Sequence, residues 1–221
     1  MASGQPTPKP ARQNAAKYER NSFCNQQFPS PDPLKRHPSP SNRVGSFVAE
    51  KDFLVDLSQV DFDRPIATLD EIRKYNPQRF EMEQLTAVVY ANEADYSCVG
   101  YKDTSLQDFW VRGHMPGMPL MPGVVMLESI AQLCSFVTQR YDLLGADVVG
   151  FGGLEDVRFR DPVLPGDRLI VMCRLAKVRR GRIIVCQFQG VVKDRVVVEG
   201  TLKGIPIPIE ALQKLQAGTR P

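Results

Sequence analysis

The chain has 221 residues, 43% of them hydrophobic and 24% charged, a composition typical of a globular protein with one sizeable core. The formal net charge is +3, but residues 1–45 carry seven Lys and Arg against two acidic residues, so the remainder sums to −2. The part expected to fold therefore lacks the basic charge of a nucleic-acid-binding domain, and no nucleic-acid partner is expected.

The cysteines and the apolar stretches exclude two further classes of protein. The five cysteines are scattered, without CxxC or metal-ligand spacing, and predict reduced thiols in a cytoplasmic protein that holds neither metal nor cofactor. The stretch that comes nearest to a membrane span, residues 120–137, is interrupted by Pro122, Glu128 and Gln132. We therefore expect no membrane insertion.

Composition divides the chain into three parts. Residues 1–45 contain eight prolines and almost no β-branched residues, so they are predicted to be a disordered, basic, Pro-rich tail. Residues 46–208 have the texture of a folded domain. Residues 209–221 are expected to form a C-terminal tail with frayed helical character.

Short elements are predicted in the first part of the domain. Residues 46–57 form an extended or short helical lead-in. Thr68 at the N-cap and Glu71 three residues later have the spacing of a capping box, and the short helix they open must end before Pro77. Two strand-like runs follow, joined by a turn at residues 92–95, and they span residues 83–91 and 96–102.

One long helix and a set of strands make up the rest. From Pro122 to about Tyr141, apolar residues occur around the whole helical circumference, which indicates a helix buried on all sides. Short connections separate the β-branched runs after it and favour antiparallel neighbours; these runs span residues 154–160, 167–178, 182–193 and 196–206. The sequence thus predicts an α+β fold in which an antiparallel sheet wraps around one long central helix.

Glu128 lies in the middle of this apolar helix. Burial favours the neutral form of a carboxyl group, which could then donate a proton near neutral pH. Gln132, one turn later on the same helix face, could orient it. Taken alone, Glu128 is more simply explained as a structural carboxyl group that backbone or water satisfies.

His114 precedes the helix in a loop stiffened by proline and glycine, MPGMPLMPG. Such a loop could hold the imidazole in place, as a general base requires. Gly123 and Val124 at the start of the helix would present unpaired N–H groups to a substrate carbonyl. A base, an acid and a carbonyl polariser together suit proton abstraction next to a carbonyl, with loss or gain of a β-hydroxyl group.

Residues 109–132, FWVRGHMPGMPLMPGVVMLESIAQ, resemble the active-site segment of the β-hydroxyacyl-ACP dehydratases of type II fatty-acid synthesis, with the motif spacing intact. Residues 157–169, VRFRDPVLPGDRL, resemble a second motif of that family, and the similarity extends over about residues 70–206. The resemblance implies the hot-dog fold and a homodimer, and it also allows a trimer of dimers.

The resemblance also implies roles for individual residues. His114 would be the catalytic base, Glu128 of the partner subunit the acid, and Gly123 the donor to the thioester carbonyl. Gln132 would orient Glu128. The reaction would be the dehydration of (3R)-hydroxyacyl-ACP to trans-2-enoyl-ACP in fatty-acid biosynthesis.

Further residues are assigned to the acyl chain and to its carrier. Met118 and Phe159 are candidates for the lining of an acyl tunnel, although at this spacing such residues are more often simple core. Because an acyl carrier protein is strongly acidic, a basic docking surface is expected near the tunnel. Its candidates are Arg112, Arg158 and Arg160.

Two departures from the family pattern bear on specificity. Met115 replaces the usual phenylalanine after the histidine. In YNPQRFEMEQLTAV, residues 75–88, only Pro77, Arg79 and Phe80 clearly match the family pattern.

Alternative functions are an acyl-thioesterase or an enoyl-CoA hydratase on the same fold, or a non-catalytic acyl-binding hot-dog protein.

Overall fold

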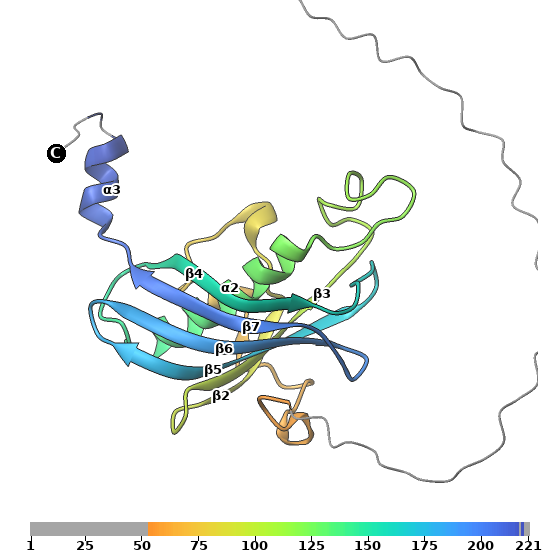
Figure 1. Ribbon diagram of the computed structural model, residues 1–221, viewed down its shortest axis with the longest axis horizontal. Helices are drawn as coiled ribbons and strands as arrows, with labels where there is room; N and C mark the ends of the chain where they lie inside the picture. The colour runs from red at the N-terminus through yellow and green to blue at the C-terminus, as the bar shows by residue number, and fades with distance from the viewer. Residues whose placement is uncertain (1–52, 217, 219–221) are drawn as a thin grey trace, which may run out of the picture. The chain divides into compact units, whose positions relative to one another are not determined.

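The protein is described by a computed structural model that covers residues 53–216 and Gly218, in which one antiparallel sheet packs against a long helix (Figure 1). The described strands are hydrogen-bonded in the order β1-β2-β3-β5-β6-β7-β4. Their bounds are β1 Ala67–Thr68, β2 Ala87–Asn92, β3 Ser97–Asp103, β4 Val149–Phe159, β5 Arg168–Arg179, β6 Ile183–Val192 and β7 Arg195–Pro206. The helical segments are η1 Leu57–Gln59, α1 Leu69–Ile72, η2 Phe80–Met82, α2 Gly123–Arg140 and α3 Ile209–Gln216.

Helix α2 confirms the predicted long helix, and the sheet packs around it. Ile130, Leu133 and Phe136 on this helix are completely buried. Buried side chains from β3, β5, β6 and β7 belong to the same core. Since full burial of one such side chain contributes roughly 1.5–3 kcal/mol, this interface supplies much of the stability that fixes the start of α2. The predicted α+β arrangement is thereby confirmed.

Strand β4 does not lie beside β5, as its short connection to that strand suggested. It pairs with β7 at the far edge of the sheet, and β5 pairs instead with β3 and β6. Residues 160–167 cross the start of α2, where the Met121 N–H donates to the Val163 carbonyl at 2.8 Å and the Val163 side chain is fully buried. Burial of Val163 therefore decides the path of this connection, and connection length alone does not reveal it.

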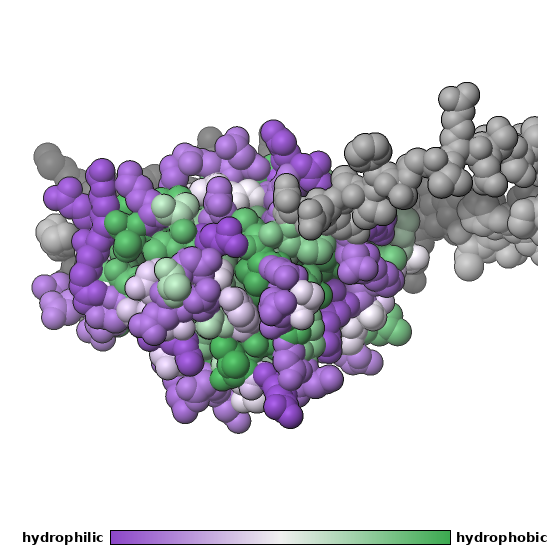
Figure 2. All heavy atoms as spheres, turned by 90° about the horizontal axis from the view of Figure 1, so that it is seen from below, coloured by the Kyte–Doolittle hydropathy of each residue, from purple (hydrophilic) through white to green (hydrophobic). Residues whose placement is uncertain are grey.

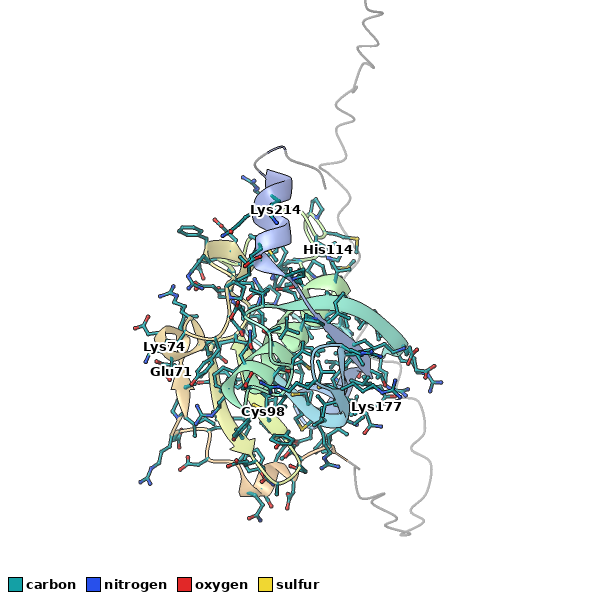
Figure 3. The ribbon with its side chains drawn as sticks, turned by 90° about the vertical axis from the view of Figure 1, so that its left-hand side faces the viewer. Glu71, Lys74, Cys98, His114, Lys177 and Lys214 are labelled. Carbon is teal, nitrogen blue, oxygen red and sulfur yellow. The ribbon has the colours of Figure 1, made fainter. Side chains whose placement is uncertain are left out.

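Strand β2 begins later than expected, at Ala87 instead of residue 83. The Gln84 N–H donates 2.8 Å to the side-chain oxygen of Gln132, so its partner lies on helix α2 and not on a neighbouring strand. The predicted capping box is also not formed, although Thr68 is the N-cap of α1. Glu71 pairs instead with Lys74, just after the end of α1 (Figure 3).

The lead-in covers the face of the sheet that is turned away from α2. Val55 is buried there, together with side chains of β2, β3 and β5. The Leu54 N–H donates to the side-chain oxygen of Gln189 at 2.9 Å, which ties the lead-in to β6. Residues 53–62 include only the short segment η1, in agreement with the irregular lead-in that was predicted. The face seen from below carries apolar patches separated by polar side chains (Figure 2).

Some expectations concern single residues or the ends of the chain. Four cysteines are free and buried within the described residues; they are Cys98, Cys134, Cys173 and Cys186. A hydrogen bond from Cys134 lowers the pKa of Cys173, but burial and the neighbouring thiols of Cys98 and Cys186 together outweigh it and raise this pKa to about 11. In residues 53–216 no helix has the length and apolarity that a membrane crossing needs. The predicted tail, residues 1–45, lies outside the described residues, and α3 bears out the helical character predicted after residue 208.

Candidate active site

His114 lies on the loop between β3 and α2, outside the sheet (Figure 3). Its backbone is fixed by hydrogen bonds from the His114 N–H to the Trp110 carbonyl at 2.8 Å and from the Leu120 N–H to the His114 carbonyl at 2.9 Å. The His114–Met115 peptide bond is cis. The loop has no regular secondary structure, as the Pro/Gly-rich sequence predicted.

The loop also determines the tautomer of the neutral imidazole. The Nδ1 atom of His114 is 3.0 Å from the carbonyl oxygen of Leu120. A carbonyl oxygen only accepts hydrogen bonds, so Nδ1 carries the proton and donates it. Nε2 is then the nitrogen with a free lone pair, and it can act as a base.

The half-buried imidazole opens onto a hollow of about 600 Å³ at the start of α2. Gly123, Val124 and Phe159 line this hollow together with His114. A Cβ atom at Gly123 would lie 2.8 Å from the ring of Phe159, so only glycine allows this contact between helix and sheet. The first N–H groups of α2 meet the hollow at the positive end of the helix dipole, where they can polarise a carbonyl group.

Glu128 is half-buried on α2 and is held by two amide side chains. The Nε2 atom of Gln132 donates to Glu128 Oε1 at 2.8 Å, and the Nε2 atom of Gln78 donates to the same oxygen at 3.3 Å. Gln132 itself is 2% exposed and also bonds to the backbone of Gln84 and Met82. The predicted orientation of Glu128 by Gln132 is thus present in the structure.

Glu128 and His114 open onto different hollows of the same chain. The hollow beside Glu128 has a volume of about 80 Å³, and its lining includes Gln78, Ala131 and Phe151. It shares no lining residue with the hollow at His114. One chain therefore presents the imidazole of His114 and the carboxyl group of Glu128 in two separate places.

The remaining predicted site residues do not all lie at the hollow beside His114. Met118 is 60% exposed and lines neither hollow, while Phe159 lines the hollow at His114. Arg112 is exposed on the His114 loop. Arg160 lines the hollow at His114 and pairs with Glu199, whereas Arg158 lines a different hollow together with Leu54 and Gln187, so the two arginines do not belong to one basic hollow.

Sequence reasoning did not single out Gln78. It lies in residues 75–88, where the resemblance to the family weakens, and its amide side chain reaches a residue 50 positions later. The one available signal was its place directly after Pro77, at the end of the predicted short helix. No group of His, Cys, Asp and Glu in the described part of the chain has the geometry of a metal site.

Known proteins share both sequence and fold with this chain. Proteins named 3-hydroxyacyl-(acyl-carrier-protein) dehydratase FabZ are similar to it. The one from Desulfotalea psychrophila is 43% identical over 107 residues, which cover 47% of this chain and 70% of that protein. The one from Mannheimia succiniciproducens is 36% identical over 134 residues, which cover 58% of this chain and 85% of that protein.

A solved structure, the dehydratase heterocomplex ApeI:P from Xenorhabdus doucetiae, superimposes with a TM-score of 0.55 at 15% identity and covers 66% of this chain and 96% of that chain. This likeness confirms the expected hot-dog fold. Residues 76–201, more than half of the sequence, match the model of the FabA-like domain. The chain therefore belongs to the FabA-like domain family.

Proposed function

We propose that the protein dehydrates (3R)-hydroxyacyl-ACP to trans-2-enoyl-ACP, the type of reaction for which its relatives are named. The observation that carries the proposal is the pair of His114, with Nε2 left as a base, and Glu128, held by two amides. These are the base and the acid that removal of water from a β-hydroxy thioester requires.

Each group has one step in the proposed reaction. The N–H of Gly123 polarises the thioester carbonyl, which makes the C2 proton more acidic. Nε2 of His114 takes that proton, the C2–H electrons form the C2=C3 double bond, and the C3–O bond breaks. Glu128 protonates the departing hydroxyl group, and water leaves. Proton exchange with solvent then restores neutral imidazole and carboxylic acid.

A homodimer would bring the two hollows together. Strand β4 lies at the edge of the sheet, where backbone groups are open to pairing, and long exposed edges are normally protected in native proteins. Phe151 and Phe159 on this strand are 53% and 52% exposed, and one lines each hollow. Pairing of two β4 strands would cover both rings and place Glu128 of one protomer beside His114 of its partner.

The carrier would dock near His114. Two of the predicted arginines are placed for this: Arg160 lines the hollow at His114, where it is paired with Glu199, and Arg112 is exposed on the loop that carries His114. Lys177, near the end of β5, is separated from His114 (Figure 3) and is less suited to a carrier that must deliver its acyl chain there.

A mixing experiment tests both the reaction and the shared site. His114→Ala and Glu128→Gln are each expected to be inactive on 3-hydroxyacyl-ACP, with enoyl formation followed by ultraviolet absorbance. A 1:1 mixture, unfolded and refolded together, should regain about a quarter of wild-type activity, because half of the dimers are mixed and each has one intact site. No recovery would contradict the shared site, and release of free thiol by the wild type would indicate a thioesterase.

A further inference from the structure

The segment that carries Gln78 is held rigidly against helix α2. Asn76 donates its side-chain N–H to the Gln132 carbonyl at 2.9 Å, and Gln132 Nε2 donates to the Met82 carbonyl at 2.6 Å. Arg79 donates to the carbonyls of Asn76 and Arg73. These bonds join both sides of Gln78 to one turn of α2, so its amide is fixed relative to Glu128.

The two amides indicate which oxygen of Glu128 would carry the proton in the proposed reaction. Both Gln132 and Gln78 donate to Oε1. In a neutral carboxyl group the oxygen that accepts such bonds is the carbonyl oxygen, so the acidic proton is on Oε2. Oε2 is therefore the atom that can protonate a departing hydroxyl group.

The side-chain oxygen of Gln78, Oε1, is buried and has no hydrogen-bond partner among residues 53–216. Gln78 and Glu128 line the same hollow of about 80 Å³, which has room for a hydroxyl group or a water molecule. Buried acceptors are rarely left unpaired in native proteins, so this oxygen calls for a donor that enters the hollow. The β-hydroxyl group of a substrate is such a donor, since it must reach Glu128 Oε2.

We propose that Gln78 is a specificity residue whose side-chain oxygen accepts the hydrogen bond of the substrate's 3-hydroxyl group, an inference that rests on the proposed dehydration. The hydroxyl oxygen accepts the proton of Glu128 while its own hydrogen bonds to Gln78. When the C3–O bond breaks, the oxygen leaves as water, with one hydrogen from the substrate and one from Glu128. A saturated acyl thioester offers no hydrogen to Gln78 and gains nothing from it.

The test compares two ligands that differ only in this hydroxyl group. In Gln78→Met, which keeps the length of the side chain, kcat/KM for 3-hydroxyacyl-ACP should fall at least about ten-fold, because the substitution removes the bond to the 3-hydroxyl group and also the 3.3 Å bond to Glu128 Oε1. The inhibition constant of saturated acyl-ACP of equal chain length should change less than about two-fold, because that ligand makes no bond to Gln78. For Gln78→Asn, which keeps the amide on a shorter side chain, kcat/KM should lie between the values for the wild type and for Gln78→Met.

Gln84→Met is the matched control. Gln84 lies in the same segment, is 2% exposed and also has a buried side-chain oxygen without a partner in the described residues, but it does not line the hollow. Its replacement should change both constants by the same factor. The inference is overturned if Gln78→Met changes both constants equally, changes neither, or matches Gln84→Met. Absence of enoyl product with the wild type would instead refute the proposed function itself, and the inference with it.

Discussion

At the scale of single residues, Gln132 links the fold to the chemistry. Its amide joins the segment before β2 to helix α2, and one of its N–H groups reaches Glu128. These bonds contribute to stability, and under the proposed function Gln132 would also position the acid.

Gln132→Met removes these hydrogen bonds while it retains an unbranched side chain. The Gln84 N–H and the Met82 carbonyl lose their partners, so the free energy of unfolding, measured by urea denaturation, should fall by about 2–3 kcal/mol. Thr138→Val on the same helix is the control. The Thr138 hydroxyl donates to the helix carbonyl of Cys134, and loss of this hydroxyl should lower the free energy of unfolding by less than about 1 kcal/mol. Equal effects of the two substitutions would contradict the role given to Gln132.

At the scale of elements, the turn between β4 and β5 depends on Asp167. The Leu164 N–H donates to its carboxylate at 2.9 Å, and the Lys193 ammonium group is 2.9 Å from it. Burial raises the pKa of Asp167, but these two partners outweigh burial and lower the pKa below its usual value near 3.8. The folded state therefore binds this proton less readily than the unfolded state does.

A group with a lowered folded-state pKa stabilises the protein above its unfolded pKa, and this stability disappears as the pH falls through the folded value. The free energy of unfolding of the wild type should thus decrease between about pH 4 and pH 2. Asp167→Asn should lower stability at pH 7 and show a shallower decrease in the acid range, where Glu83, with its pKa lowered by Arg73, still titrates. Parallel curves for the two proteins from pH 5 to pH 2 would count against this account.

The elements also show how far sequence reasoning extends. Helix α2 could be predicted because its apolar pattern and its proline start are local signals. The position of β4 could not be predicted. It follows from the burial of Val163 at the start of α2, and this contact joins distant parts of the chain. The roles of His114 and Glu128 came from a motif with fixed spacing, whereas Gln78 meets Glu128 only through the fold.

At the scale of the whole molecule, assembly through β4 is the main expectation. Phe151→Arg places a charge at this edge, so the protein should sediment as a monomer and lose about 100-fold or more in activity, since each site would lack its acid or its base. Circular dichroism should be unchanged. Val178→Arg, at an exposed position of β5, is the control that should leave assembly intact. A fully active, dimeric Phe151→Arg protein would exclude β4 as the interface.

The lead-in sets a lower limit on the length of a fragment that keeps the sheet covered. The region that matches the FabA-like domain starts at residue 76, yet Val55 and its neighbours shield Val99, Tyr101 and Met172 from solvent. A fragment trimmed to the family boundary would expose these side chains and expose β2 along its outer edge, where β1 had paired. Such a fragment would be prone to aggregate, so the unit that can be expressed and studied in isolation is longer than the domain by which the protein is recognised.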